Sequence, residues 1–303
     1  MARLAAFSPA VRTLEESVAR AKAAERLGYE SVWTTQLPPA RDASLVLAAY
    51  AAATQQIKLG TGVLPIYTRH PTAMVQMALT LDEMSAGRFI LGIGVSHKVT
   101  VEDFWGLRLE HPVDAMREYF TIVRTSIRDG GCSFDGHYFT ARWTYIGPRR
   151  ADLPIMISAL NPRMLELAGE LSDGVVLYMC GPAYIKAVVI PALEAGRAKV
   201  GKSLDGFEIV ATFDACLTSD RKAALEVYGK TLDRYSALPY YRKAMEAGEF
   251  NPDELAGIGD ASQVRAAVER LRESGVTLVG VGPFGGHDGA KGFEATLEAA
   301  ALA

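Results

Sequence analysis

Short apolar runs of strand length alternate with longer helical stretches from one end of the chain to the other. Such alternation is typical of parallel strands joined by right-handed helical crossovers. Eight strands, each followed by a helix, predict a closed (β/α)8 barrel, the α/β fold known as the TIM barrel. The predicted strands cover residues 3–7, 31–34, 57–63, 89–93, 155–158, 174–178, 207–213 and 277–281.

An open doubly wound sheet is the alternative architecture for alternating strands and helices. It requires a Gly-x-Gly-x-x-Gly turn after a strand near the start of the chain, and no such turn is present. Gly92-Ile-Gly94 is too short for this motif and follows the fourth predicted strand. The barrel is therefore the predicted fold.

The intervening stretches are predicted to be amphipathic helices because apolar residues recur at helical spacing. The three clearest faces are Leu14, Val18, Ala21 and Leu27; Leu45, Ala48 and Ala52; and Met74, Met77, Leu81 and Met84.

Three segments depart from the simple repeat. Residues 97–113 form a predicted loop before a helix at 113–128, and residues 236–258 are expected to form extra short helices. Residues 131–146 alternate around Asp135-Gly136 and predict a β-hairpin. Insertions after barrel strands lie over the mouth and often act as lids. No linker or repeat divides the chain, so residues 1–303 are interpreted as one domain.

The composition bounds the classes of partner and compartment. Among 303 residues, 32 Lys and Arg against 35 Asp and Glu give a net charge of −3, which offers no basic surface to nucleic acid. Cys132, Cys180 and Cys216 are far apart and contain no CxxC pair, as expected in a reducing compartment. No run of about eighteen apolar residues and no secretion signal is visible, so a cytoplasmic protein without membrane contact is expected.

The segment Asn161-Pro-Arg-Met164 follows the fifth predicted strand and is a candidate anion site. Asn suits the N-cap of a helix and Pro its first turn, which leaves free N–H groups beside Arg163. Ordinary capping explains the same residues without a ligand. Met179-Cys-Gly-Pro182, after the sixth strand, could form the opposite wall of the same pocket.

Further polar residues follow the second and fourth predicted strands. His97 lies beyond Gly94-Val-Ser96 and is expected to point into the mouth, where an imidazole can donate or accept a proton near neutral pH. Gln36 ends the second strand and can hydrogen-bond a carbonyl or a ring edge. His70 and Asp42 are more simply interpreted as helix caps. The glycines of Gly60-Thr-Gly62 can mark a bulge or a close approach of the backbone to a ligand.

Several catalytic motifs are missing. The sequence contains no His-x-Glu-x-x-His motif or carboxylate cluster, so no metal site is predicted. It also lacks the Gly-x-Ser-x-Gly elbow of serine hydrolases and the phosphate loop of nucleoside triphosphatases. A site without its own nucleophile is expected to use the chemistry of a cofactor.

The chain resembles the luciferase-like family of flavin and deazaflavin oxidoreductases over about residues 12–285. The most specific stretch runs from Leu59-Gly-Thr-Gly-Val63 through Arg69-His-Pro71 and Gly87-Arg-Phe89 to Leu91-Gly-Ile-Gly-Val-Ser-His97. Asn161-Pro-Arg-Met-Leu-Glu-Leu-Ala168 resembles the family segment that holds the cofactor phosphate. Trp33-Thr-Thr-Gln36 and Ser96-His97 look more like the branch that uses coenzyme F420, a 5-deazaflavin.

The resemblance implies a (β/α)8 barrel with a non-prolyl cis peptide at Gly62-Val63 behind the cofactor ring. Gln36 and His97 would stand near the reactive edge of the ring as catalytic residues, with Ser96 beside the cofactor. The phosphate would lie at residues 159–163 with Cys180 and Gly181. The residues of that segment are Ala159, Leu160, Asn161, Pro162 and Arg163.

Two departures bear on the direction of the reaction. The sugar-phosphate dehydrogenase of this branch has Asp-His where this chain has Thr35-Gln36, and Glu where it has His97. Without that His base, a reductase using reduced F420 fits better, with His97 as a proton donor to a small organic substrate. Arg163 would replace a Lys that relatives use at the phosphate.

Three functions remain open from the sequence. The first is an F420-dependent oxidoreductase, and the second a reduced-FMN monooxygenase that consumes oxygen. The third is a non-catalytic flavin-binding protein. By analogy with relatives, a homodimer packed through helices next to the third strand is expected.

Overall fold

The computed structural model describes residues 3–9, 13–247, 249, 251–284 and 290–301. Within these ranges no helix is both long and apolar enough to cross a membrane.

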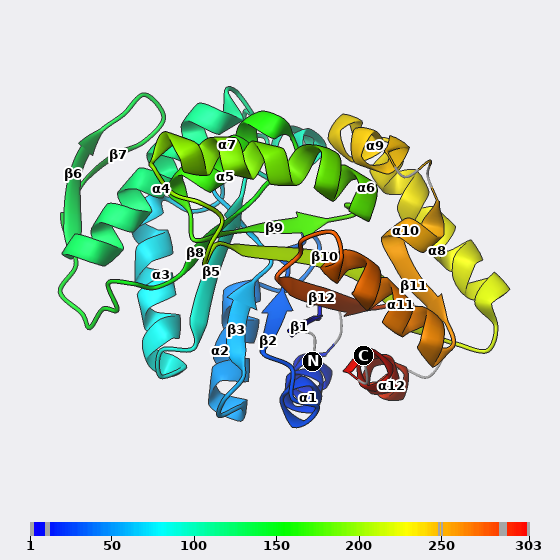
Figure 1. The fold of residues 1–303 in the computed structure, drawn as a ribbon. Coiled ribbons are helices and arrows are strands. Elements are labelled where there is room, and N and C mark those ends of the chain that lie inside the picture. Colours follow the sequence, from blue (N-terminus) through cyan, green and yellow to red (C-terminus); the bar gives the residue numbers. More distant parts are fainter. Residues whose placement is uncertain (1–2, 10–12, 248, 250, 285–289, 302–303) are drawn as a thin grey trace.

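A closed barrel of eight parallel strands forms the centre of the molecule (Figure 1). Closure is complete because the first strand pairs with the last, with Leu4 opposite Val279, and the last pairs with β10. The barrel strands are β1 (Leu4–Phe7), β2 (Ser31–Thr34), β3 (Lys58–Thr61), β5 (Phe89–Gly94), β8 (Ile155–Ser158), β9 (Gly174–Tyr178), β10 (Glu208–Leu217) and β12 (Leu278–Pro283). The predicted (β/α)8 barrel is confirmed.

Helices surround this barrel on the outside (Figure 1). Those that follow barrel strands are α1 (Leu14–Arg26), α2 (Ala43–Ala53), α3 (Pro71–Met84), α4 (Pro112–Asp129), α5 (Pro162–Leu171), α6 (Pro182–Tyr184), α7 (Ile190–Lys199), α8 (Arg221–Ser236), α11 (Ala261–Arg272) and α12 (Ala290–Ala301). Two further helices, α9 (Pro239–Glu246) and α10 (Pro252–Leu255), lie between α8 and α11, and the π-helix η2 (Ile185–Val189) joins α6 to α7.

Two aromatic rings fill the inside of the barrel. Phe7 and Trp33 stack with their centroids 5.6 Å apart, and both belong to the apolar cluster that lines the inner face. Glycines make room for them. A Cβ added at Gly60 would lie 2.3 Å from the Trp33 ring, and one at Gly62 would lie 2.6 Å from the Phe7 ring. The two rings therefore form the floor beneath the mouth of the barrel.

The three predicted insertions are found, with differences. β6 (Gly131–Asp135) and β7 (Thr140–Thr144) form the expected hairpin, far from the barrel axis in Figure 1. The predicted loop at 97–113 contains a π-helix, η1 (Thr100–Phe104). The segment 236–258 forms α9 and α10, but it also supplies an unpredicted strand, β11 (Ala256–Gly259), which pairs in parallel with β10.

Two strand predictions were wrong in their bounds. β10 extends to Leu217 because its second half pairs with β11, a partner that local sequence does not reveal. The strand predicted at 57–63 ends at Thr61, and a short strand, β4 (Leu64–Pro65), follows the bulge and pairs with β5.

The predicted buried face of α2 was also wrong. Leu45 is 72% exposed, whereas Val46, Leu47, Tyr50 and Ala51 are buried. Almost every residue of this helix is apolar, so the spacing of apolar residues cannot indicate which face is covered. On α3, Met74 and Leu81 are buried as predicted, but Met84 is half-exposed.

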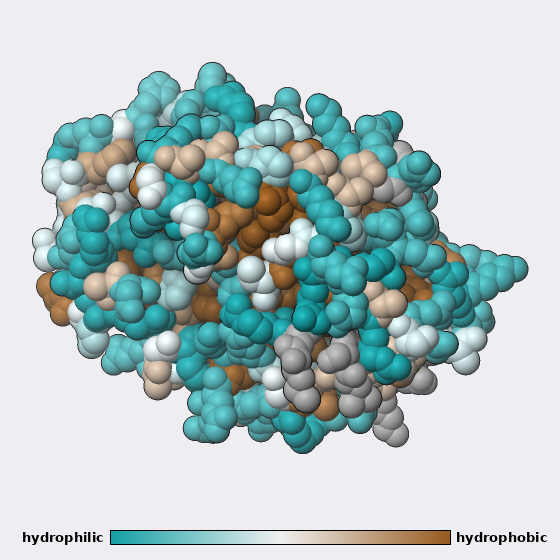
Figure 2. Space-filling view, in the orientation of Figure 1, coloured by the Kyte–Doolittle hydropathy of each residue, from teal (hydrophilic) through white to brown (hydrophobic). Residues whose placement is uncertain are grey.

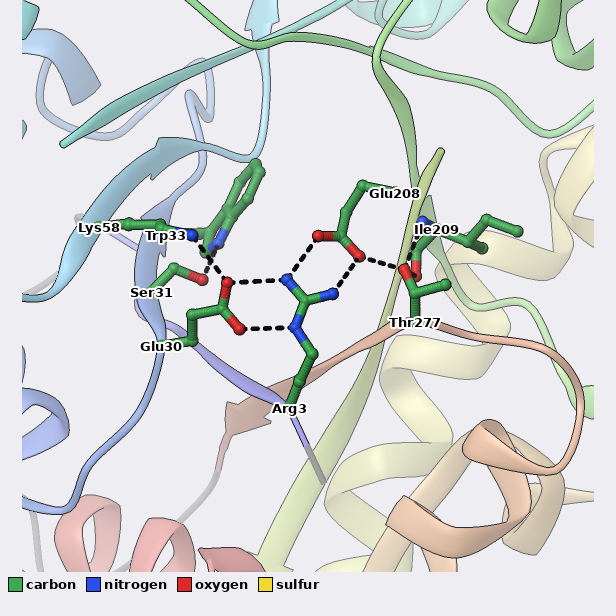
Figure 3. A network of polar contacts seen from close by, with 8 residues as sticks. All are labelled: Arg3, Glu30, Ser31, Trp33, Lys58, Glu208, Ile209 and Thr277. Carbon is green, nitrogen blue, oxygen red and sulfur yellow. Dashed lines mark hydrogen bonds and ion pairs between the residues drawn. The ribbon is translucent and has the colours of Figure 1, made fainter. Parts of the chain in front are cut away.

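An ionic network closes the end of the barrel opposite the mouth (Figure 3). Arg3 donates two hydrogen bonds to Glu30 and two to Glu208, at 2.7 to 3.0 Å. Lys58 adds an ion pair to Glu30 at 2.9 Å. Hydrogen bonds from Arg3, with Lys58 nearby, lower the pKa of Glu30 to about 2 although partial burial raises it. Arg3 thus connects β1 to carboxylates that precede β2 and begin β10.

Replacing Arg3 by Leu should lower the free energy of unfolding by about 2 kcal/mol. Breaking a fully buried pair costs about 3–5 kcal/mol, and the exposure of half of the Arg3 side chain reduces this value. Because the pKa of Glu30 is depressed in the folded state, the stabilisation is present above about pH 4.5 and is lost as pH falls towards 2.

Urea unfolding of both proteins at pH 7 and at pH 3 measures this difference. Arg272→Leu breaks an exposed i,i+3 pair with Glu269 and is the matched control, expected to leave the stability nearly unchanged. Equal stability of Arg3→Leu and the wild type at pH 7 would show that the network does not stabilise the barrel.

Candidate active site

The bulge between β3 and β4 stands at the mouth of the barrel. The Gly62-Val63 peptide bond is cis, as the resemblance implied. The chain that follows β2 holds this bulge: Gly62 N donates to Thr34 O at 2.9 Å, and Thr35 Oγ1 donates to Gly62 O at 2.8 Å. The bulge also packs against β5, because a Cβ added at Gly94 would lie 2.8 Å from Val63. The bulge is therefore held from both sides, by the chain that follows β2 and by β5.

Gln36 is bound to its own segment of chain. Its Oε1 accepts a hydrogen bond from Ala43 N at 2.9 Å, at the start of α2, and its backbone N donates to Val63 O at 3.4 Å. Asp42 caps α2 as predicted and forms an ion pair with Arg69. The Gln36 side chain thus positions the chain beside the bulge.

His97 faces the inserted helices α8 and α9. Its ring centroid lies 5.5 Å from that of Tyr241 and 6.2 Å from that of Tyr235, both in edge-to-face geometry. Burial lowers the pKa of His97, and the positive charge of Arg234 lowers it further. Ser96, just before it, has a left-handed backbone with φ +62°. His97 is therefore an oriented imidazole whose surroundings favour the neutral form.

The segments predicted to hold a phosphate lie at the ends of the neighbouring strands β8 and β9. Asn161 caps α5 through its side chain, which accepts from Met164 N at 3.1 Å, so this cap is confirmed. Gly181 begins α6 with no side chain bound to its first N–H groups. Tyr184 Oη donates to Leu160 O at 3.0 Å and ties the two segments together.

The other residues of these segments differ in exposure. Arg163 and Pro162 are exposed at the start of α5, whereas Ala159 and Cys180 are buried. Burial raises the pKa of the Cys180 thiol, so Cys180 is a packing group rather than a nucleophile. Tyr241 connects this region with His97, because its ring contacts His97 and its pKa is raised by burial and by the nearby Tyr235 and Cys180.

The sequence analysis missed Tyr178, Asp214 and Tyr235. Tyr178 Oη donates to Asp214 Oδ2 at 2.8 Å, and Tyr235 packs edge-to-face on Tyr178 at 5.2 Å. The one available indication was Asp214 itself, a carboxylate within the apolar run Ile209–Cys216. Within the described ranges, no three His, Cys, Asp or Glu side chains are grouped to hold a metal ion.

Two hollows on the surface lie away from this mouth. One, of about 470 Å3, is lined by residues at the beginnings of β10 and β12, among them Phe207, Ile209 and Thr277. In Figure 2 apolar side chains gather in a hollow near the centre of the view, beside α7. The other, of about 590 Å3, lies on the hairpin around Cys132 and Trp143. Barrel enzymes keep their chemistry at the opposite, carboxyl ends of the strands, so neither hollow belongs to the site.

Comparison with known families agrees with this geometry. Residues 2–278 match the family model described as luciferase-like monooxygenase. The chain belongs to this family. Among its luciferase-like relatives, a putative coenzyme F420-dependent oxidoreductase of Mycobacterium tuberculosis is 32% identical over 85% of this chain and 87% of its own length. A 5,10-methylenetetrahydromethanopterin reductase of Archaeoglobus fulgidus is 36% identical over 67% of this chain and 60% of its own length.

Solved structures share the fold. The coenzyme F420-dependent tetrahydromethanopterin reductase of Methanopyrus kandleri has a TM-score of 0.81 at 24% identity, over 97% of this chain and 96% of the other. An F420-dependent secondary alcohol dehydrogenase, solved with an F420-acetone adduct, has a TM-score of 0.83 at 22% identity, with 99% of each chain covered. At these identities the likeness establishes the barrel fold alone.

Replacing Arg234 by Gln should raise the pKa of His97 towards its ordinary value of about 6.5. The substitution removes a nearby positive charge that disfavours the imidazolium, while the burial of the ring remains. NMR titration of the histidine side chains measures both proteins. The matched control is Arg242→Gln, which removes a charge from the neighbouring helix α9. A His97 that titrates alike in wild type and Arg234→Gln would contradict the electrostatic account.

Proposed function

We propose that the protein is an oxidoreductase that transfers a hydride between coenzyme F420 and a small organic substrate, more specifically a reductase that uses reduced F420. The fixed bulge at Gly62-Val63 above the Phe7–Trp33 floor is the observation that supports this most. The name of the Mycobacterium tuberculosis relative, a putative coenzyme F420-dependent oxidoreductase, supports the same cofactor.

The residues at the mouth fit a flat ring that carries a phosphate. The bulge at Gly62-Val63 is held by Thr35 and packs on Gly94, so it would form a fixed support for such a ring. Where the phosphate of such a ring would lie, the N-termini of α5 and α6 are side by side, joined through the Tyr184–Leu160 hydrogen bond. Their N–H groups and Arg163 form a donor set of the kind that binds phosphate.

Each predicted site residue takes a role from its place in this arrangement. When bound, the deazaflavin supplies a hydride from a ring carbon. Gly62 and Val63 would support the ring, Ser96 would stand beside it, and Gln36 would hold the chain that carries the bulge. The residues that would surround the phosphate are Ala159, Leu160, Asn161, Pro162 and Arg163, with Cys180 and Gly181.

His97 is the substrate-facing residue of the proposal. As a neutral imidazole it donates a hydrogen bond from one ring nitrogen and accepts one at the other. Tyr235 and Tyr241 hold the ring from the lid side, which keeps its orientation and excludes water. A polar substrate group between His97 and the cofactor ring would thus be oriented for reaction.

A reduced-FMN monooxygenase is the second candidate. The description of the matched family favours it, and one of the similar structures is a monooxygenase in complex with FMN. Binding of FMN with consumption of oxygen on turnover would establish this function instead. A non-catalytic flavin carrier would bind a cofactor tightly and turn over nothing.

We also propose that residues 1–303 act as one domain in a cytoplasmic homodimer. The helix α2 packs against β3. Its outer face is apolar, with Leu45 72% exposed, and supports an interface there. The partners proposed are the cofactor and a small-molecule substrate, with no nucleic acid or membrane.

Titration of the purified protein with oxidised F420, followed by fluorescence, should show saturable binding, and FMN should bind far more weakly. Arg163→Ala should weaken F420 binding about tenfold, because a charge-assisted hydrogen bond contributes about 1.5–3 kcal/mol. Lys202→Ala removes an equal charge from a turn at the far end of the barrel and is the control. Tight binding of FMN alone would refute the F420 proposal.

A further inference from the structure

Tyr178 and Asp214 form a polar pair on the inner face of the barrel. Val176 and Val210 belong to the cluster that lines this face. Side chains alternate along a strand, so Tyr178, two residues after Val176, and Asp214, four after Val210, point to the same side. The hydroxyl of Tyr178 donates to Asp214 Oδ2 at 2.8 Å. This pair has no role in the cofactor proposal above.

The second oxygen of Asp214 faces a space left by a glycine. A Cβ added at Gly282, on β12, would lie 3.5 Å from Asp214 Oδ1, in ordinary van der Waals contact. Within the described part of the chain no group donates a hydrogen bond to Oδ1. One layer deeper, the hydroxyl of Thr212 is buried without a partner. The pair therefore presents one unengaged carboxyl oxygen to the mouth.

The groups around Asp214 come from several elements, and one of them is cationic. Tyr178 belongs to β9, Tyr228, Arg234 and Tyr235 to α8, and Tyr241 to α9, while His97 follows β5. Of the described residues of β11 and β12, none is titratable. Burial raises the pKa of Asp214 to about 6, against smaller lowering by the Tyr178 hydrogen bond and by Arg234.

We propose that Asp214 is the proton donor of the active site, acting through Oδ1, and that Tyr178 is the positioning residue that holds Oδ2. This rests on the reductase function proposed above. The substrate class is a compound with a polarised carbon–oxygen or carbon–nitrogen double bond. Its carbon receives the hydride, and the electron pair of the double bond moves to the heteroatom. The heteroatom takes the proton from Oδ1, and the resulting carboxylate is reprotonated from water.

Under this assignment His97 orients the substrate and Asp214 donates the proton. Burial and Arg234 lower the pKa of His97 and so favour the neutral imidazole, which suits it to orient the substrate. Asp214 keeps a fraction of its proton near neutral pH because it is desolvated. Titratable groups whose environments push their pKa values in opposite directions are a recognised mark of acid and base roles.

Infrared difference spectroscopy of the wild-type protein against pH tests whether Asp214 carries this proton. A carboxylic-acid C=O band should titrate near pH 6 and be missing in Asp214→Asn. In Tyr178→Phe the midpoint should move to higher pH, because a hydrogen bond that favours the carboxylate is lost. Asp103→Asn, an exposed carboxylate of η1, is the control and should keep the band. The absence of the band, or an unmoved midpoint in Tyr178→Phe, would overturn the assignment.

Turnover of a panel of ketones and imines with reduced F420 tests the same group in the reaction. Asp214→Asn should lower kcat by about 100-fold or more while F420 binding stays unchanged. A wild-type rate in Asp214→Asn would refute the proton-donor role alone. If the wild type binds F420 and reduces none of these acceptors, the reductase function fails, and the role of Asp214 fails with it.

Discussion

The packing of Phe7 against Trp33 inside the barrel is the constraint on which the rest of the site depends. The two rings fit only because Gly60 and Gly62 carry no side chain towards them, since a Cβ at either position would lie within 2.6 Å of a ring. Beneath them, Trp33 Nε1 donates to Ser31 Oγ at 2.8 Å and Arg3 closes the bottom of the barrel. Glycine at these positions thus sets the depth of the core.

The second determinant of the site is the inserted segment that contains α8 and α9. The barrel strands alone would leave His97 and Tyr178 facing solvent. Tyr235 and Tyr241 cover them, with ring centroids 4.9 Å apart, and so lower the polarity around His97 and Asp214. Burial then acts in opposite directions on the two groups, because it disfavours the charged form of each. The lid therefore sets the protonation states as well as the shape of the site.

Helix caps and barrel strands could be predicted because they depend on residues close to one another in the sequence. The caps at Asp42, His70 and Asn161 were predicted correctly because a capping side chain bonds to N–H groups two or three residues away. The strands of the barrel followed from short apolar runs between helical stretches. The candidate anion segments followed from the capping residues, whereas the cis peptide at Gly62-Val63 and the identity of the cofactor came only through the family resemblance.

Features that depend on distant partners could not be predicted in the same way. β11 exists because β10 offers it an edge, and the covered face of α2 depends on which helices stand beside it. Tyr178 and Asp214 are 36 residues apart, and only the parallel pairing of β9 with β10 brings their oxygens together. The hydrogen bond from Ala43 N to the amide oxygen of Gln36, seven residues away, was likewise not predicted.

A crystal structure of the protein with oxidised F420 would test the central claim most directly. The account predicts electron density for the ring against Gly62-Val63, above Phe7 and Trp33, with the phosphate at the N-termini of α5 and α6 beside Arg163. Density for the cofactor at the opposite end of the barrel, or at the mouth with its phosphate away from both helices, would contradict it.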